Sequence, residues 1–139
     1  MANTRSVTVR MKSDLHYESK NAQGNVVEID MLDPEHKQAQ SPMDLLLSAL
    51  GGCASVDAVL MMKKKRREVL DFFVEVEGVR NDGVPGYYTE IALHFVLVSP
   101  DATAEEFEKV VVLSVDKYCS VASSLKSSIS YTSEIRRSL

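Results

Sequence analysis

The sequence contains no tryptophan and few other aromatic residues, with five tyrosines and four phenylalanines in 139 residues. Its core must therefore be built mainly from aliphatic side chains. Cysteine is equally scarce, because Cys53 and Cys119 are the only two. So few cysteines exclude a disulfide-rich secreted scaffold. In a reducing compartment, a pair of cysteines is more often redox-active or incidental than a permanent cross-link.

The sequence also lacks an excess of positive charge. Its formal net charge of −4 argues for a soluble chain and against a general nucleic-acid surface. The segment Met1–Arg10 has no apolar stretch of the kind found in secretory signals, so we expect a cytoplasmic protein. The length and the hydrophobic content of 45% are those of one globular domain. We find no repeat or linker that would divide residues 1–139.

The N-terminal part of the chain predicts three short strands. Apolar and polar residues alternate over residues 6–12, 15–19 and 26–31, which is typical of strands with one buried face. Turn-forming residues at 21–25 separate the second strand from the third. We therefore expect an antiparallel meander, followed by an irregular loop over residues 32–40.

The stretch from Ser41 to Arg67 predicts one long helix. Ser41 suits the N-cap, Pro42 suits the first helical position, and Asp44 can complete a capping box. The basic block KKKRR at the other end complements the helix dipole. Because the helix is apolar on nearly every face, we expect it to be buried on all sides. Two glycines before Cys53 indicate either a close approach of another backbone or a local irregularity.

An apolar helix followed by five cations could also be a transmembrane span. Asp57 near its middle argues against this, because an ionised aspartate inside a bilayer costs about 3 kcal/mol. The basic block could bind nucleic acid, but no aromatic residues are interleaved with it. A solvated helix end is therefore the better interpretation. We predict neither a membrane nor a nucleic acid as a partner.

The rest of the chain predicts a hairpin, two helices and a final strand. Residues 72–80 and 87–98 alternate and are separated by turn residues. Thr103 and Glu106 predict the capping box of a helix whose buried stripe extends to Tyr118. A short helix is expected from Cys119 to Leu125, and a strand over residues 129–135. The predicted order is βββ-α-ββ-α-α-β, an α+β domain.

Few side chains are candidates for chemistry. His16 and His94 lie on predicted strands and His36 lies in a loop, without the spacing of a zinc site, so we predict no metal. The sequence has no phosphate-binding loop and no nucleophile elbow, and we predict no cofactor. Cys119 lies at a predicted helix start, where backbone N–H groups lower the pKa of a thiol. From the residues alone, Cys53 and Cys119 could be reactive thiols or small buried apolar side chains.

Two motifs carry a resemblance to a known family. SPMDLLLSALGGC, which ends at Cys53, and KYCSVASSL, which contains Cys119, resemble the OsmC/Ohr family of thiol-dependent hydroperoxide reductases, and in particular its OsmC-like branch. The resemblance covers essentially the whole chain. It implies an intertwined (swapped) homodimer with the long helix buried at its centre. It also implies peroxiredoxin-like chemistry on an organic hydroperoxide, with Cys53 as the attacking thiol, Cys119 as the resolving thiol and an external dithiol as the reductant.

The sequence departs from the family's pattern near the first cysteine. The family's glutamate ten residues before that cysteine is Met43 here. The family's thiolate-binding arginine has its nearest counterpart in Arg10, with Lys12 and Lys20 as weaker candidates. Asp57, one turn beyond the first cysteine, would repel a thiolate unless it were paired or protonated. A non-peroxidatic protein that binds a small apolar or electrophilic ligand at the dimer interface is the alternative function. A structural dimer with two buried thiols is a third.

Overall fold

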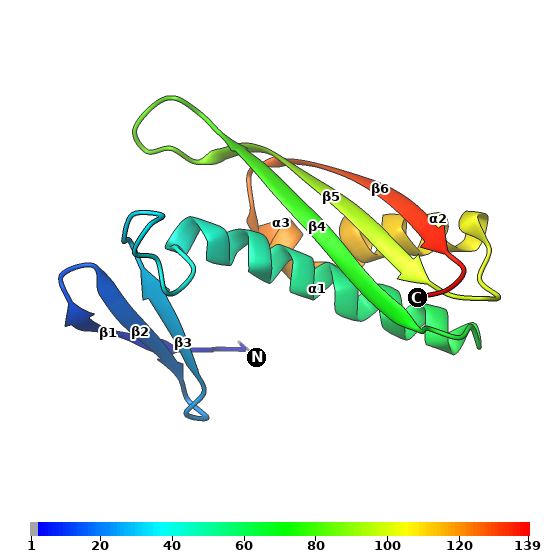
Figure 1. Ribbon diagram of the computed structural model, residues 1–139, viewed down its shortest axis with the longest axis horizontal. Helices are drawn as coiled ribbons and strands as arrows, with labels where there is room; N and C mark the ends of the chain where they lie inside the picture. The colour runs from blue at the N-terminus through cyan, green and yellow to red at the C-terminus, as the bar shows by residue number, and fades with distance from the viewer. Residues whose placement is uncertain (1–2) are drawn as a thin grey trace. The chain divides into compact units, whose positions relative to one another are not determined.

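A computed structural model describes residues 3–139, which form two compact units. The first unit ends at Leu46 and the second spans Leu47–Leu139, so helix α1 (Pro42–Lys64) begins in one and continues through the other. The elements follow the predicted order (Figure 1). There is one addition, a five-residue π-helix, η1 (Ser114–Tyr118). The predicted α+β class is confirmed. That residues 1–139 act as one domain stays a prediction.

The first unit contains an antiparallel sheet in the predicted order β1-β2-β3. Its strands are β1 (Val7–Ser13), β2 (His16–Asn21) and β3 (Val26–Asp30). The register places Met11 opposite Tyr17, so the apolar residues share one face. Within the chain β1 is not half-buried as predicted, because Met11 is 61% exposed and the other residues of β1 are exposed too. Alternation identifies the apolar face but does not show what covers it.

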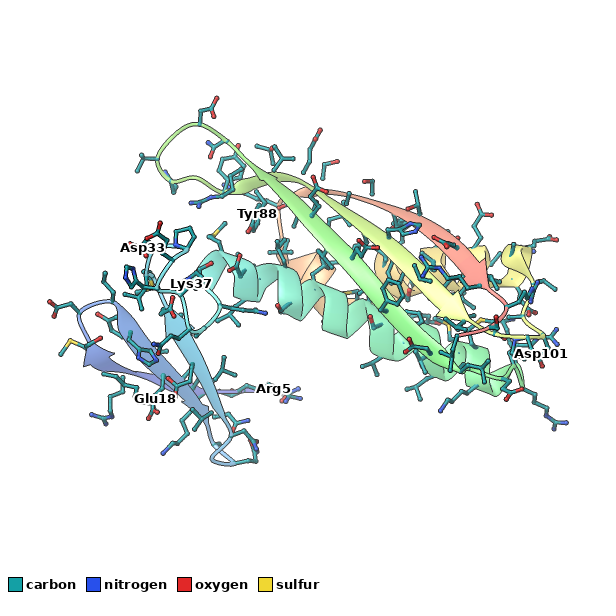
Figure 2. The ribbon with its side chains drawn as sticks, viewed as in Figure 1. Arg5, Glu18, Asp33, Lys37, Tyr88 and Asp101 are labelled. Carbon is teal, nitrogen blue, oxygen red and sulfur yellow. The ribbon has the colours of Figure 1, made fainter. Side chains whose placement is uncertain are left out.

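Asp30 organises the loop between β3 and α1. Its buried carboxylate accepts hydrogen bonds from the backbone N–H groups of Leu32 (3.2 Å), Gln38 (2.8 Å) and Ala39 (2.7 Å). Lys37, labelled in Figure 2, donates from Nζ to Asp30 Oδ1 at 2.5 Å and to the Asp30 carbonyl oxygen at 2.9 Å. The hydrogen bond from Lys37 and those from the backbone hold the pKa of Asp30 far below its ordinary range. A segment without sequence periodicity is thus ordered by one carboxylate.

The N-terminus of α1 has the predicted capping box. The backbone N–H of Asp44 donates to Ser41 Oγ at 3.0 Å, and the N–H of Ser41 donates to Asp44 Oδ2 at 3.2 Å. These bonds satisfy two groups that would otherwise lack partners at the helix start. Asp44 therefore has the structural role that its position predicts.

The C-terminus of α1 is a Schellman motif with an arginine in the position that usually holds glycine. The backbone N–H of Arg67 donates to the carbonyl of Met62 at 3.1 Å, and the N–H of Arg66 donates to that of Lys63 at 2.9 Å. This geometry requires the left-handed region, and Arg66 has a φ of 64°. A side chain in this region costs on the order of 1 kcal/mol, a cost that glycine does not carry.

We expect Arg66→Gly to raise the free energy of unfolding by about 1 kcal/mol, because glycine adopts the left-handed region without strain. The matched control is Lys63→Gly, in the last regular turn of the same helix, which should lower it by about 1 kcal/mol. Urea denaturation of the two variants measures both effects. An Arg66→Gly variant no more stable than the natural chain would contradict the strain at this position.

The second unit is built on a sheet with β5 at its centre. The strands are β4 (Asp71–Arg80), β5 (Tyr88–Val98) and β6 (Ser128–Arg136). The predicted hairpin of β4 and β5 is confirmed, and β6 pairs with β5 in parallel. The central strand supplies much of the core, with five side chains that are at most 1% exposed: Ile91, Leu93, Phe95, Val96 and Leu97.

Helices α1 and α2 (Ala104–Leu113) pack on the same face of this sheet. The alternation of β4 places Phe72, Val74 and Val76 on one face. Gly51 of α1 lies against this face, because a Cβ added to it would be 3.0 Å from Val76 Cγ2 and 3.3 Å from Val74 Cγ1. Phe107 of α2 meets Phe72 edge to face, with ring centroids 6.3 Å apart. The two helices and the sheet thus enclose one core.

The glycine pair in α1 has a different explanation from the predicted one. Gly51 allows close packing of sheet side chains rather than of another backbone, while a Cβ on Gly52 would meet nothing within 4 Å. The helix is regular through both residues. The predicted irregularity beside Cys53 is therefore wrong.

Burial of α1 within the chain is confined to one stripe. Outside this stripe, Val56 is 59% exposed and Leu60 is 60% exposed. Within one chain the helix is therefore not buried on all sides as predicted. α1 is long and apolar enough to cross a membrane, but the core helices of soluble proteins can have the same length and composition. The fully buried side chains of the stripe are Leu50, Ala54, Ala58 and Met62.

Candidate functional site

The structure brings the two cysteines together in the second unit. Cys53 is half-buried in the middle of α1, and Cys119 is 3% exposed immediately before α3 (Ser120–Ser124). Both are free thiols, and they lie close enough together that Cys53 raises the pKa of Cys119. The residues lie 66 positions apart in the sequence, so only the packing of α1 beside the η1–α3 segment makes them neighbours.

Cys119 is the N-cap of α3. Its backbone is extended, with φ −76° and ψ 103°, and its Sγ accepts a hydrogen bond from the N–H of Ala122 at 3.4 Å. Burial raises the pKa of the Cys119 thiol, the N–H of Ala122 opposes this in part, and Cys53 raises the pKa further. The N–H groups of the helix start lower the pKa as predicted, but their effect is smaller than that of burial. The pKa of Cys119 is therefore raised overall, against the expectation of a lowered value.

The π-helix η1 leads directly into Cys119. The hydroxyl of Tyr131 on β6 donates to Asp116 Oδ2 at 2.6 Å, which ties η1 to the sheet and raises the pKa of Tyr131. A π-turn holds more residues than an α-turn, so the 3.6-residue pattern fails here. Tyr118, predicted to lie on the buried stripe, is 49% exposed. Such π-segments are frequent at functional sites, and no sequence signal identified this one.

The predicted thiolate-stabilising cation, Arg10, lies in the first unit. It is exposed on β1, opposite Glu18, which is labelled in Figure 2. Lys12 forms an ion pair with Glu28 at 3.1 Å. What Arg10 does toward Cys53 stays a prediction.

Each histidine has a polar or acidic partner within its own unit. The ring-nitrogen distances are 2.7 Å from His16 to Glu28, 2.6 Å from His36 to Asp33, and 2.6 and 2.9 Å from His94 to Thr132 and Glu134. Among residues 3–139, no group of three or more His, Cys, Asp or Glu side chains could hold a metal ion. These contacts agree with a structural role for the histidines.

A cavity of about 680 Å³ lies between α1 and α2. Of the residues that line the cavity, Asp57 is the nearest to Cys53 in the sequence, one helical turn beyond it. The sequence shows no sign of this cavity, because its walls come from two helices separated by a hairpin. The lining residues are Asp57, Leu60, Met61, Lys64 and Lys65 of α1, Lys109, Val110 and Leu113 of α2, and Tyr118 of η1.

An ion pair joins the segments that lead into the two walls of this cavity. Arg67 Nε lies 2.7 Å from Glu106 Oε1, and Arg67 Nη2 donates to Glu106 Oε2 at 3.2 Å. Glu106 Oε1 also accepts from the N–H of Thr103 at 2.9 Å, so the predicted capping box is present. Arg67 is the main cause that lowers the pKa of Glu106. Nearby, Asp101 (Figure 2) accepts from the N–H of Glu68 at 3.0 Å.

Comparison with known proteins agrees with this fold. A family model described as "OsmC-like protein" matches residues 35–134. Protein YhfA of Escherichia coli (strain K12) is 37% identical over 95 residues, which are 68% of this chain and 71% of that protein.

Solved structures extend the likeness to nearly the whole chain. An OsmC-like protein from Mycoplasma pneumoniae superposes with a TM-score of 0.83 at 21% identity, over 99% of this chain and 100% of that one. The organic hydroperoxide resistance protein OhrB of Bacillus subtilis gives 0.63 at 15% identity, over 96% and 98%. At these identities the structures show a common fold.

Proposed function

This chain belongs to the OsmC-like protein family, and on that premise we propose that it reduces organic hydroperoxides through Cys53 and Cys119. The observation that carries the proposal is the close approach of two free thiols from segments far apart in the sequence. A pair of free thiols in contact can form a disulfide with little rearrangement. Proteins that share the fold include an organic hydroperoxide resistance protein, which supports a role in peroxide detoxification.

The environments of the two thiols support the predicted order of attack. Cys119 is 3% exposed and its pKa is raised, so near neutral pH it is a protonated thiol away from solvent. Cys53 is half-buried and therefore the more accessible sulfur. An attacking thiol must meet the peroxide, whereas a resolving thiol needs only to meet the oxidised partner.

The proposed reaction has three balanced steps. The Cys53 thiolate attacks one oxygen of the hydroperoxide, the O–O bond breaks, and an alkoxide leaves and takes up a proton as an alcohol. The product on Cys53 is a sulfenic acid, which Cys119 attacks with loss of water to form the disulfide. An external dithiol then restores both thiols by two exchanges and becomes a disulfide itself. We propose the cytoplasm, a reducing compartment, as the location.

Mass spectrometry of the intact natural protein tests this proposal. One equivalent of cumene hydroperoxide should remove two hydrogens from the chain within seconds, and dithiothreitol should restore them. Peptide mapping should place the new disulfide between Cys53 and Cys119. Unchanged thiols after an hour with peroxide would contradict the proposal and would fit a structural pair.

We further propose that the chain acts as a homodimer, in which a partner's N-terminal strands supply the predicted cation Arg10 to the thiol site. Support comes from each unit taken by itself. The β1-β2-β3 sheet exposes an apolar row that includes Val9 at 57%, and α1 exposes Val56 at 59%. Exposed apolar surfaces of this kind mark interaction sites.

We expect Val56→Asp to shift the species in solution from twice 15.4 kDa toward 15.4 kDa, because a carboxylate buried in an interface is strongly unfavourable. Light scattering coupled to size exclusion measures the mass. The matched control is Val84→Asp, at a residue that is 101% exposed in the β4–β5 loop, and its mass should equal that of the natural chain. A dimer unaffected by Val56→Asp would exclude this face of α1 from the interface.

A second candidate is a protein that binds a small apolar or electrophilic ligand without peroxide chemistry. The cavity between α1 and α2 favours it, because its lining combines apolar side chains with charged ones and includes Asp57, one turn beyond Cys53. The two functions differ in one measurement. If peroxide leaves both thiols unchanged while a maleimide alkylates Cys53 in the folded protein, the binding function is supported and the peroxidase function is contradicted.

A further inference from the structure

We propose that the hydrogen bond between Tyr131 and Asp116 positions Cys119 for disulfide formation with Cys53. Both are positioning residues, because they act through Cys119 and need not touch the peroxide. This role deepens the proposed function and rests on it, since it names what controls the second step. In that step the Cys119 sulfur attacks the sulfur of the Cys53 sulfenic acid. The S–S bond forms, the S–O bond breaks, and hydroxide leaves with the thiol proton as water.

Cys119 lies at the junction of two short helical segments. It is the C-cap of η1 and the N-cap of α3, and each of these segments is five residues long. Helices this short have little stability of their own in water. The position of the Cys119 sulfur is therefore set by the contacts that the junction makes with the rest of the chain.

The backbone hydrogen bonds at Cys119 are local, whereas that of Asp116 reaches the sheet. The N–H groups of Ala122 and Ser123 donate to the sulfur and the carbonyl oxygen of Cys119, at 3.4 and 3.1 Å. These two bonds shape the start of α3 but join it to no other element. Asp116, three residues before Cys119, accepts from the hydroxyl of Tyr131 on β6 at 2.6 Å. This contact lies within the second unit of one chain, so it needs no partner chain.

Tyr131 gives the contact a fixed base. It pairs with Leu93 of the central strand, whose side chain is 1% exposed. Paired residues of neighbouring strands point to the same face of a sheet, so the phenol ring projects toward the face that forms the core. The core therefore holds the ring, and the hydroxyl of Tyr131 holds Asp116.

A small displacement of Cys119 is enough to change its reactivity. Asp116 and Cys119 are separated by less than one turn of a π-helix, so movement at one is passed to the other. A disulfide needs Cβ atoms about 3.8 Å apart and an S–S bond of about 2.05 Å. A misplacement of about 1 Å between reacting groups can slow a step about a hundredfold. Loss of the hydrogen bond should therefore slow disulfide formation and leave the attack of Cys53 on peroxide unchanged.

Single-turnover kinetics of Tyr131→Phe with cumene hydroperoxide tests this role, because the variant keeps the ring and lacks only the hydroxyl. We expect the Cys53 sulfenic acid to form at the natural rate and to persist about tenfold longer. Asp116→Leu should have the same effect, and the double variant should be no slower than either single one, since both changes remove one bond. Asp116→Asn keeps an acceptor oxygen and should stay within about threefold of the natural protein.

Thr132→Val is the matched control. Thr132 follows Tyr131 on β6, and its hydroxyl oxygen lies 2.6 Å from His94 Nδ1, on the opposite face of the sheet. Loss of this contact should leave the lifetime of the sulfenic acid within about twofold of the natural value. Equal delays in Tyr131→Phe and Thr132→Val would reduce the effect to a general loosening of β6 and would overturn the positioning role. A natural or shortened lifetime in Tyr131→Phe would overturn it too.

Equilibration with dithiothreitol measures the same positioning without peroxide. Oxidised dithiothreitol takes two electrons and two protons from the two thiols and becomes the dithiol, while the Cys53–Cys119 disulfide forms. Tyr131→Phe should lower the equilibrium constant of this exchange about tenfold, or about 30 mV for two electrons, and Thr132→Val should leave it unchanged. An unchanged constant in Tyr131→Phe would contradict the positioning role. A lowered constant in a protein inert to peroxide would support that role and contradict only the proposed function.

Discussion

Replacing Cys53 by serine is expected to lower the rate of organic hydroperoxide reduction on the order of 10³-fold or more. The reason is that serine has no accessible anion near neutral pH and cannot cleave the O–O bond. Consumption of cumene hydroperoxide with dithiothreitol as the dithiol measures the rate. The matched control is Ser55→Ala, two residues along the same helix, which should leave the rate within about twofold.

Cys119→Ser separates attack from resolution. This variant should react with one equivalent of peroxide and then hold the Cys53 sulfenic acid, which dimedone traps as an adduct visible by mass. Turnover with a dithiol should continue only as fast as the dithiol attacks the sulfenic acid directly. If instead Cys53→Ser accumulates a sulfenic acid on Cys119, the assigned order of attack is reversed.

The raised pKa of Cys119 adds a dependence on pH. Disulfide formation requires the Cys119 thiolate, and burial holds its pKa above the ordinary range. The fraction of thiolate, and with it the rate of resolution, should rise about tenfold for each pH unit up to that pKa. Stopped-flow measurement of the lifetime of the sulfenic acid tests this. A lifetime independent of pH between 6 and 8 would contradict the protonated state of Cys119.

Replacing Asp30 by asparagine is expected to release the loop between β3 and α1. Asparagine cannot form an ion pair with Lys37. Its amide nitrogen would also place N–H donors next to at least one of the backbone N–H groups from which the carboxylate now accepts hydrogen bonds. Leaving such groups without partners is costly. Hydrogen exchange at Gln38 and Ala39 should become faster by on the order of tenfold to a hundredfold.

The pH dependence of the same loop gives an independent check. The pKa of Asp30 is lower in the folded chain than its ordinary value of 3.8, so its contribution to stability is complete above that value. It is lost as the pH falls from 3.8 through the lower folded pKa. In the natural protein, exchange in the loop, corrected for its intrinsic rate, should rise over this range, while Asp30→Asn should show no such step.

Asp33→Asn is the control for Asp30→Asn. Asp33 lies in the same loop, but its side chain is 63% exposed and accepts hydrogen bonds from the backbone N–H and the ring of His36, not from Gln38 or Ala39. Its replacement should leave exchange at Gln38 and Ala39 close to that of the natural protein. Equal effects of the two substitutions would show that Asp30 does not organise the loop.

Much of the fold could be predicted from the sequence, because the signals involved are local. The capping boxes of Ser41 with Asp44 and of Thr103 with Glu106 depend on residues three positions apart, and both are present. Alternation located all six strands within a few residues. The paired cysteine motifs also led to the family, since a likeness of motifs does not require knowledge of the packing.

The predictions that failed concern surroundings rather than local structure. Periodicity identified the apolar faces of β1 and α1. It could not show that apolar side chains of both elements are exposed to solvent in a single chain. The helix start at Cys119 was placed correctly, yet burial decides the direction in which its pKa moves. The loop organised by Asp30 has no periodic signal, because its bonds join one carboxylate to backbone groups two, eight and nine residues away.

By itself, the sequence determined the order of the elements, the ends of the helices and the two sulfurs on which the chemistry depends. These features follow from interactions within one or two turns of the chain. Only the tertiary structure decided that Cys53 lies next to Cys119, that β6 returns parallel to β5, and that a cavity lies between α1 and α2. Each of these joins segments distant in sequence, and such contacts are decided by how the helices and the sheet bury their apolar faces together.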